Sequence, residues 1–128
     1  MALPPCHYSF QFYLDSSNKL SLLWTQRSVD SFLGLPFNIA SYALLLNIIC
    51  KITDCEPGEL IFSGGDCHVY KNHLNQVMEM LEREPKTLPV LEINKDIKSL
   101  DCLKKCTVED FQLKGYEHHG TIKAPMAV

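Results

Sequence analysis

Residues 6–14 read CHYSFQFYL, with apolar side chains at every even position and mainly polar side chains at the odd positions. An alternation with a period of two residues indicates a β-strand that has two different faces. The polar cluster at residues 15–18 ends this pattern, and apolar residues with a tryptophan resume at residues 20–25. We therefore expect two neighbouring antiparallel strands that are joined by a short polar turn.

The chain beyond these strands contains both helical and extended patterns. Residues 37–52 are apolar on nearly every face, which predicts a helix enclosed by other elements. Residues 74–81 carry apolar side chains at the spacing of an amphipathic helix, which Pro85 ends. A loop is expected at residues 63–66. Further short strands are expected at residues 59–62, 67–70, 88–93 and 111–113.

These patterns predict the fold class. We expect an α+β fold, in which a mixed, mainly antiparallel sheet packs with a long buried helix. The chain has 128 residues, of which 46% are hydrophobic, and this is enough for one core. Residues 1–128 are therefore expected to form a single domain segment.

Composition also bears on the class of ligand. The net charge is -3 and the basic residues are scattered, so nucleic acid is not an expected partner. The longest apolar run, at residues 39–49, is shorter than the roughly 20 residues of a membrane span, and no secretory signal is evident. We expect a cytoplasmic protein with reduced cysteines. The cysteine and histidine spacings do not match a structural zinc site, so no metal is expected.

Two clusters near the first strand pair could carry chemistry. Cys6 follows two prolines and would be a nucleophile if nearby positive charge stabilised its thiolate, although a buried inert thiol is the plainer explanation. Arg27 and Ser28 end the second strand, where a guanidinium and a hydroxyl could hold a phosphate. An ordinary surface ion pair would explain the arginine equally well.

Two further clusters lie later in the chain. Asn38 offers both an acceptor and two donors where the apolar helix begins, and it could instead be the N-cap of that helix. Gly64 and Gly65 permit a close backbone approach, and His68 and Tyr70 would point to one side of an extended segment. For a lone histidine, a satisfied position in the core is the plainer explanation.

The order and spacing of all these clusters resemble those of thymidylate synthases. The segments that carry the resemblance are LPPCH at residues 3–7, QRS at 26–28, LPFNIASY at 35–42, GDCHVY at 65–70 and IKAPMAV at 122–128. The resemblance covers the whole chain. It implies the fold shared by thymidylate synthases and dCMP hydroxymethylases, with the N-terminal half of the family chain absent. Trp24 and Thr25, just ahead of this QRS segment, depart from the family pattern, and this departure is not expected to change the roles of the site residues.

The resemblance also implies a reaction. In it, dUMP is reductively methylated to dTMP, with 5,10-methylenetetrahydrofolate as co-substrate and without a metal. Cys6 would add to carbon 6 of the uracil ring, and Arg27 would hold that sulfur as a thiolate. Asn38 would recognise uracil and stabilise the developing enolate oxygen, and it would favour uracil because dCMP hydroxymethylases carry an aspartate there. His7 would line the pyrimidine cavity as the fourth catalytic residue.

The resemblance assigns binding roles to further residues. Ser28 would contact the dUMP phosphate, and His68 and Tyr70 the deoxyribose hydroxyl. The full set of implied dUMP contacts is Gln26, Arg27, Ser28, Asp30, Asn38, His68 and Tyr70. The implied folate contacts are Asp30, Leu33, Gly34, Phe37, Ala127 and Val128, the last two in a C-terminal segment that closes over the ligands.

The resemblance implies a homodimer formed through the sheet face. Two other functions stay open at this point: a catalytically incomplete fragment for nucleotide binding or dimerisation, and a dUMP hydroxymethylase in which water captures the methylene intermediate. The sequence equally fits a separate synthase and the C-terminal part of a fusion with dihydrofolate reductase.

Overall fold

The structure is a computed structural model that describes residues 4–126. The chain forms two compact units, Met1–Lys71 and Asn72–Val128. The C-terminal residues Ala127 and Val128, which were expected to contact folate, lie outside the described residues. The expectation of a single domain segment stays a prediction, because a compact unit is not necessarily a domain that folds on its own.

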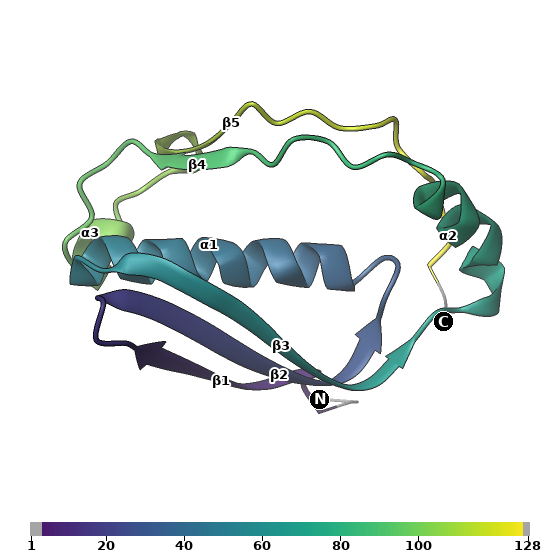
Figure 1. Cartoon of the computed structure of the whole chain (residues 1–128), viewed down its shortest axis with the longest axis horizontal. Helices are drawn as coiled ribbons and strands as arrows, with labels where there is room; N and C mark the ends of the chain where they lie inside the picture. Colours follow the sequence, from purple (N-terminus) through teal and green to yellow (C-terminus); the bar gives the residue numbers. More distant parts are fainter. Residues whose placement is uncertain (1–3, 127–128) are drawn as a thin grey trace. The chain divides into compact units, whose positions relative to one another are not determined.

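The first unit is built on a three-stranded sheet in the order β1-β2-β3, and β1 (His7–Leu14) and β2 (Lys19–Asp30) are antiparallel (Figure 1). This confirms the pair predicted from the alternation. The turn between the strands is held by Asp15, whose Oδ1 accepts the backbone N–H groups of Ser17 and Lys19 at 2.8 and 2.9 Å. Asn18 adopts a left-handed φ of 63°, which asparagine tolerates better than most residues.

A β-bulge interrupts the start of β1. The pairing of His7 with Gln26 shifts by one residue before Ser9 pairs with Thr25. The shift places His7 on the sheet face of Gln26, so the predicted single face for all the odd positions of this stretch is wrong at His7. A bulge inserts one unpaired residue and re-aims the neighbouring side chains.

The third strand, β3 (Glu56–His68), is parallel to β2 and is longer than predicted. It continues through residues 63–66, so the predicted loop there is wrong, and so is the predicted strand at Val69 and Tyr70. The reason is a close approach between backbones, because a Cβ atom on Gly65 would lie 2.8 Å from the carbonyl oxygen of Arg27. Gly65 therefore allows close strand pairing where composition alone favoured a turn.

The helix α1 (Leu35–Thr53) connects β2 to β3, as a parallel pair of strands requires. It is longer than the predicted span at both ends. Pro36 lies in its first turn, where the missing N–H is not needed, and Asp54 ends it with a left-handed φ of 57°.

The core of this unit lies between α1 and the sheet (Figure 1). Leu20 and Leu22 of β2 pack there with Leu46 and Cys50 of α1. Fully burying a leucine such as Leu22 contributes about 2 kcal/mol. By length and composition alone, α1 passes the test for a membrane span, as the core helices of soluble proteins and signal sequences also do. In this structure, Leu46 and Cys50 of α1 pack against the sheet of the same unit.

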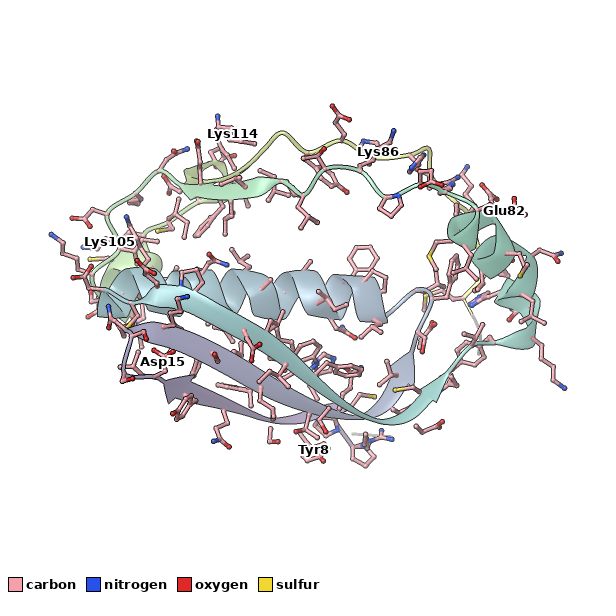
Figure 2. The ribbon with its side chains drawn as sticks, in the orientation of Figure 1. Tyr8, Asp15, Glu82, Lys86, Lys105 and Lys114 are labelled. Atoms are coloured by element: carbon pink, nitrogen blue, oxygen red, sulfur yellow. The ribbon has the colours of Figure 1, made fainter. Side chains whose placement is uncertain are left out.

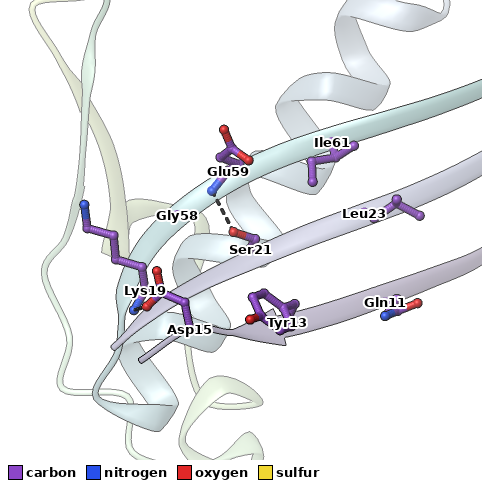
Figure 3. A pocket seen from close by; sticks show the side chains of 9 residues that line it. All are labelled: Gln11, Tyr13, Asp15, Lys19, Ser21, Leu23, Gly58, Glu59 and Ile61. Carbon is purple, nitrogen blue, oxygen red and sulfur yellow. Dashed lines mark hydrogen bonds between the residues drawn. The ribbon is translucent and has the colours of Figure 1, made fainter. Parts of the chain in front are cut away.

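The opposite face of the sheet carries a hollow of about 420 Å³ (Figure 3). Ser21 and Leu23 lie on this face because side chains alternate along β2. The hydroxyl of Ser21 accepts the backbone N–H of Glu59 at 3.0 Å. The hollow contains none of the site residues predicted from the sequence. Its lining residues are Gln11, Tyr13, Asp15, Lys19, Ser21, Leu23, Gly58, Glu59 and Ile61.

The second unit contains the helix α2 (Leu74–Leu81), which confirms the amphipathic pattern, and an antiparallel pair of strands, β4 (Val90–Ile93) and β5 (Phe111–Lys114). The short helix α3 (Leu100–Leu103) and two 3-10 turns, Lys71–His73 and Val108–Asp110, complete the secondary structure of the described residues. Charged side chains such as Lys114 and Glu82 point outward (Figure 2).

Residues 123–125 form hydrogen bonds, through their backbone carbonyls, with α2 and with the 3-10 turn before it. His73 is fully buried, and its Nε2 lies 2.7 Å from the carbonyl oxygen of Pro125. Gln76 donates to the Lys123 carbonyl at 3.4 Å. These two contacts fix the position of residues 123–125 relative to α2.

Candidate active site

The predicted site residues of the first unit gather where three segments meet. These segments are the start of β1, the end of β2 and the first turn of α1. Antiparallel pairing places His7 opposite Gln26, and the backbone N–H of Arg27 donates to the carbonyl oxygen of Cys6 at 2.9 Å. Backbone hydrogen bonds therefore bring Cys6 beside Arg27.

The side chain of Arg27 fixes the approach to Cys6. Its Nε donates to the carbonyl oxygen of Pro5 at 3.2 Å, and its Nη2 donates to that of Pro4 at 2.7 Å. The guanidinium thus lies against the two residues before Cys6, whose thiol is free and half-buried. The positive charge therefore lies against the segment that leads into Cys6, and the partial exposure of this thiol disfavours the plainer explanation of a buried inert cysteine.

An amide pair links β2 to α1. Gln26 is only 4% exposed, and its Nε2 donates to Asn38 Oδ1 and to the Ser28 carbonyl, both at 3.1 Å. The plainer explanation for Asn38 was a helix N-cap, and it is wrong. The N-cap is Gly34, and Asn38 lies one turn inside the helix, where its backbone N–H bonds to Gly34.

The loop between β2 and α1 is held by Asp30. Its Oδ1 accepts the backbone N–H groups of Phe32 and Leu33, both at 3.0 Å. A Cβ atom on Gly34 would lie 3.1 Å from the Asp30 carbonyl oxygen, so the glycine leaves room for this tight loop. Asp30 therefore positions the first turn of α1, and with it Asn38.

Two aromatic residues that were not predicted as site residues support this cluster. Tyr42 stacks on His7 and on Trp24, with ring centroids 5.6 and 4.9 Å apart, and its hydroxyl lies 3.2 Å from His7 Nδ1. Trp24 donates from Nε1 to Gln26 Oε1 at 3.4 Å. Trp24 therefore contacts a predicted site residue, and the expectation that this departure leaves the site roles unchanged stays a prediction. The sequence held a signal for both residues, since Trp24 is two positions from Gln26 on a strand and Tyr42 is four from Asn38 on a helix.

His68 and Tyr70 lie beside the end of β2. His68 pairs with Asp30 in the parallel ladder, and its carbonyl accepts the backbone N–H of Ser31 at 2.9 Å. The rings of His68 and Tyr70 meet edge to face, with centroids 5.0 Å apart. The side chain of His68 is 28% exposed, so the plainer explanation of a core histidine is wrong.

The predicted folate contacts of this unit surround the start of α1. Leu33 and Gly34 are half-buried, and Phe37 is 75% exposed. Among residues 4–126, no group of three or more histidine, cysteine, aspartate or glutamate side chains is arranged to hold a metal ion. The expected absence of a metal and the roles of the individual site residues stay predictions.

Comparisons with known proteins bear on what this cluster is. A family model described as thymidylate synthase matches residues 1–128. The chain is 52% identical to a probable thymidylate synthase of Escherichia phage T5, with 99% of this chain and 46% of that protein covered. It is 54% identical to a thymidylate synthase of Francisella philomiragia, with 99% of this chain and 45% of the relative covered.

A solved structure shows the same fold. The crystal structure of thymidylate synthase from T4 phage superposes with a TM-score of 0.90 at 48% identity, covering 100% of this chain and 48% of that one. The likeness supports the predicted α+β fold class. The chain spans about half the length of the relatives that it matches. The family match over all of its residues, the identities near one half and the shared fold together place this chain in the thymidylate synthase family.

Proposed function

We propose that this chain supplies the nucleophile and most of the pyrimidine contacts for the reductive methylation of dUMP to dTMP, with 5,10-methylenetetrahydrofolate as co-substrate. The observation that carries the proposal is that Cys6, Arg27 and the Gln26–Asn38 amide pair all lie at the same end of β2. A thiol, a fixed positive charge and a buried amide are what covalent addition to a uracil ring requires.

The chemistry begins with the sulfur of Cys6 as a thiolate. The sulfur forms a bond to carbon 6 of uracil, and the displaced electron pair moves to carbon 5 and oxygen 4 as an enolate. Asn38 stabilises that oxygen through a donated N–H group. Carbon 5 then bonds to the methylene carbon of the folate as the bond from that carbon to N10 breaks and N10 takes up a proton. Water accepts the proton that carbon 5 then loses.

The remaining steps restore the ring. N5 of the tetrahydrofolate then leaves from the methylene carbon, and a hydride from the same folate reduces that carbon to a methyl group. The C6–S bond breaks as the C5–C6 double bond returns, so the products are dTMP and dihydrofolate. Water must be kept out until the hydride arrives, because it would otherwise capture the methylene intermediate.

The other site residues bind the substrates. Arg27 and Ser28 hold the dUMP phosphate, for which a guanidinium offers a fork of donors. His68 and Tyr70 bind the deoxyribose hydroxyl, and the pairing of His68 with Asp30 and the contact between the His68 and Tyr70 rings support this role. His7 lines the pyrimidine cavity, where its contact with Tyr42 fixes the ring.

The folate site lies around the start of α1. Asp30, Leu33 and Gly34 form its loop side, and Phe37 offers an exposed aromatic ring for stacking on the pterin. Ala127 and Val128, which lie outside the described residues, are proposed to close over the bound folate.

A second copy of the chain is the proposed partner of the sheet face that carries the hollow. Tyr13 and Ile61 lie on this face and are 65% and 40% exposed. Exposed apolar side chains around a shallow hollow suit a partner of the same kind, and the protein is proposed to act as a homodimer in the cytoplasm. Sedimentation analysis at several concentrations tests this, and a monomer at every concentration would contradict it.

The central experiment tests the nucleophile. This chain is joined to the N-terminal half of a family member, and dihydrofolate production is followed by absorbance with dUMP and methylenetetrahydrofolate. Cys6→Ala should abolish turnover, whereas Cys106→Ala, which removes a thiol of the second unit, should retain it. Activity that persists without the Cys6 sulfur would show that the nucleophile assignment is wrong.

The same joined protein also tests the two alternative functions, a nucleotide-binding fragment and a hydroxymethylase. Binding of dUMP in a calorimetric titration without any turnover would indicate a nucleotide-binding fragment. Product analysis distinguishes dTMP from a hydroxymethylated nucleotide. The relatives named above are described as thymidylate synthases, which does not favour the hydroxymethylase.

A further inference from the structure

We propose that Trp24 is a positioning residue that sets which atom of Asn38 faces the nucleotide base, and so contributes to the choice of uracil over cytosine. The inference rests on the proposed function, because it assigns a cause to the orientation of a residue in that same site. The observation behind it is a chain of two hydrogen bonds, one buried and one part-buried, that runs from Trp24 through Gln26 to Asn38.

The first step concerns the orientation of Gln26. An indole N–H can only donate, so the amide atom that faces Trp24 must be the oxygen Oε1. The carbonyl oxygen of Ser28 can only accept, so the amide atom that faces it must be the nitrogen Nε2. Both neighbours require the same orientation. Gln26 is 4% exposed, so water does not offer a substitute partner.

The second step carries this polarity to Asn38. Because Gln26 Nε2 donates, the atom of Asn38 that it meets must be the acceptor Oδ1, and the distance of 3.1 Å fits a hydrogen bond. The other branch of the Asn38 amide, the donor Nδ2, is then the branch left for a ligand. Oδ1 has a second lone pair, which can still accept a ring N–H.

The third step matches this polarity to a base. Uracil presents an acceptor oxygen at position 4 and an N–H at position 3, which suit a donor and an acceptor on Asn38. Cytosine presents an amino donor at position 4 and an acceptor at position 3. With Asn38 held in the observed orientation, cytosine would bring a donor to a donor.

The fourth step explains why Trp24 can serve as a fixed donor. Its side chain is 1% exposed and is stacked on Tyr42, with ring planes 15° apart. Phe62 covers it on β3, with ring centroids 4.8 Å apart. The indole is therefore held in place by packing that does not depend on the hydrogen bond itself.

The test removes the donor and keeps the ring. Trp24→Phe preserves an aromatic side chain between Tyr42 and Phe62 but deletes the N–H group. The bond to Gln26 is long, at 3.4 Å, and the Ser28 carbonyl still orients the amide. We therefore expect the preference for dUMP over dCMP, measured by calorimetric titration of the full chain, to fall by about threefold. If Trp24 had a purely structural role, Trp24→Phe would weaken the binding of dUMP and dCMP equally and leave the ratio of their affinities unchanged.

Asn38→Asp provides the reference variant. It should lower the same ratio by more, and adding Trp24→Phe to it should change the ratio no further, because the effect of Trp24 passes through Asn38. If Asn38→Asp alters the ratio and Trp24→Phe does not, the inference fails while the proposed function stands. If the wild-type chain shows no preference for dUMP, the proposed function fails, and the hydrogen-bond chain is then decided by a spectroscopic arm.

That arm uses the fact that Trp24 is the sole tryptophan of the sequence, so its indole N–H gives one assignable NMR signal. Gln26→Ala should shift this signal and speed its exchange with solvent. Trp24→Phe should shift the side-chain amide signals of Gln26 and Asn38. Asn47→Ala, which removes another α1 asparagine bonded to Ala43, should leave the indole signal in place. An indole signal that is indifferent to Gln26→Ala would overturn the inference.

Discussion

Gly65→Ala tests whether the pairing of β2 and β3 sets the geometry of the site. In the structure, a Cβ atom on Gly65 would lie 2.8 Å from the carbonyl oxygen of Arg27, 3.3 Å from its carbonyl carbon and 3.4 Å from its Cα. All three are backbone atoms, so no side-chain rotation can relieve the contact. The two strands must move apart by a few tenths of an ångström, and Arg27 must move with them.

The magnitude follows from two opposing effects. Overpacking a close contact costs about 1–3 kcal/mol. Replacing glycine by alanine recovers about 0.4–1 kcal/mol by restricting the unfolded chain where, as at Gly65, the backbone lies outside the left-handed region. We expect a net destabilisation of about 1–2 kcal/mol. We also expect weaker dUMP binding, since the displaced backbone carries the Arg27 guanidinium away from the carbonyls of Pro4 and Pro5.

Urea unfolding followed by circular dichroism measures the first effect, and calorimetric titration with dUMP measures the second. Gly120→Ala is the matched control, because a Cβ atom there would meet nothing within 4 Å. The reasoning is refuted if Gly65→Ala unfolds at the wild-type urea midpoint and binds dUMP as tightly as the wild type. Equal destabilisation by Gly120→Ala would also refute it, because the effect would then not depend on the contact with Arg27.

Three further predictions concern groups outside the site. The hydrogen bond from the Thr107 backbone lowers the pKa of Asp110, so its stabilisation is present at neutral pH and is lost as the pH falls below about 4. Asp110→Asn should therefore reduce the change in melting temperature that is measured across that pH window. Burial raises the pKa of the Cys50 thiol, and the nearby Cys55 raises it further. Iodoacetamide should therefore modify Cys50 more slowly than an exposed thiol, and mass spectrometry can measure the two rates. His73→Ala removes a buried hydrogen bond to the tail, and should cost about 1–3 kcal/mol and speed hydrogen exchange at residues 120–125.

Much of the fold follows from side-chain periodicity alone. The alternation at residues 6–14, the polar turn and the resumed apolar run predict β1 and β2, because a strand exposed to different surroundings on its two faces needs that pattern. The stripe at residues 74–81 predicts α2 for the same kind of reason. These are local signals, since the residues that make the pattern also form the element.

The bulge at His7 and the length of β3 could not be predicted in this way. Both depend on strand pairing, in which a backbone is fixed by a partner that is distant in sequence. Gly64 and Gly65 favour a turn by composition, yet here both lie within β3, and Gly65 allows the strand to approach Arg27 closely. At these positions the pairing with β2 outweighs the local preference of the glycines for a turn.

The candidate site was predictable as a set of residues but not as an arrangement. The family resemblance named Cys6, Gln26 and Asn38, whereas the amide pair that joins Gln26 to Asn38 required coordinates. Trp24 was missed because a departure from a family pattern carries no sign of its contacts. Its position on the face of Gln26 was the available signal.

Arg27 connects these observations, because each part of this residue is used by a different segment. Its backbone N–H donates to the Cys6 carbonyl, and its backbone carbonyl lies against Gly65. Its side chain donates to the carbonyls of Pro4 and Pro5. The spacing between the proposed nucleophile and the proposed phosphate-binding group is thus set by main-chain contacts within folded strands. A site built in this way is ordered before the nucleotide arrives, so substrate binding need not supply the free energy to assemble it.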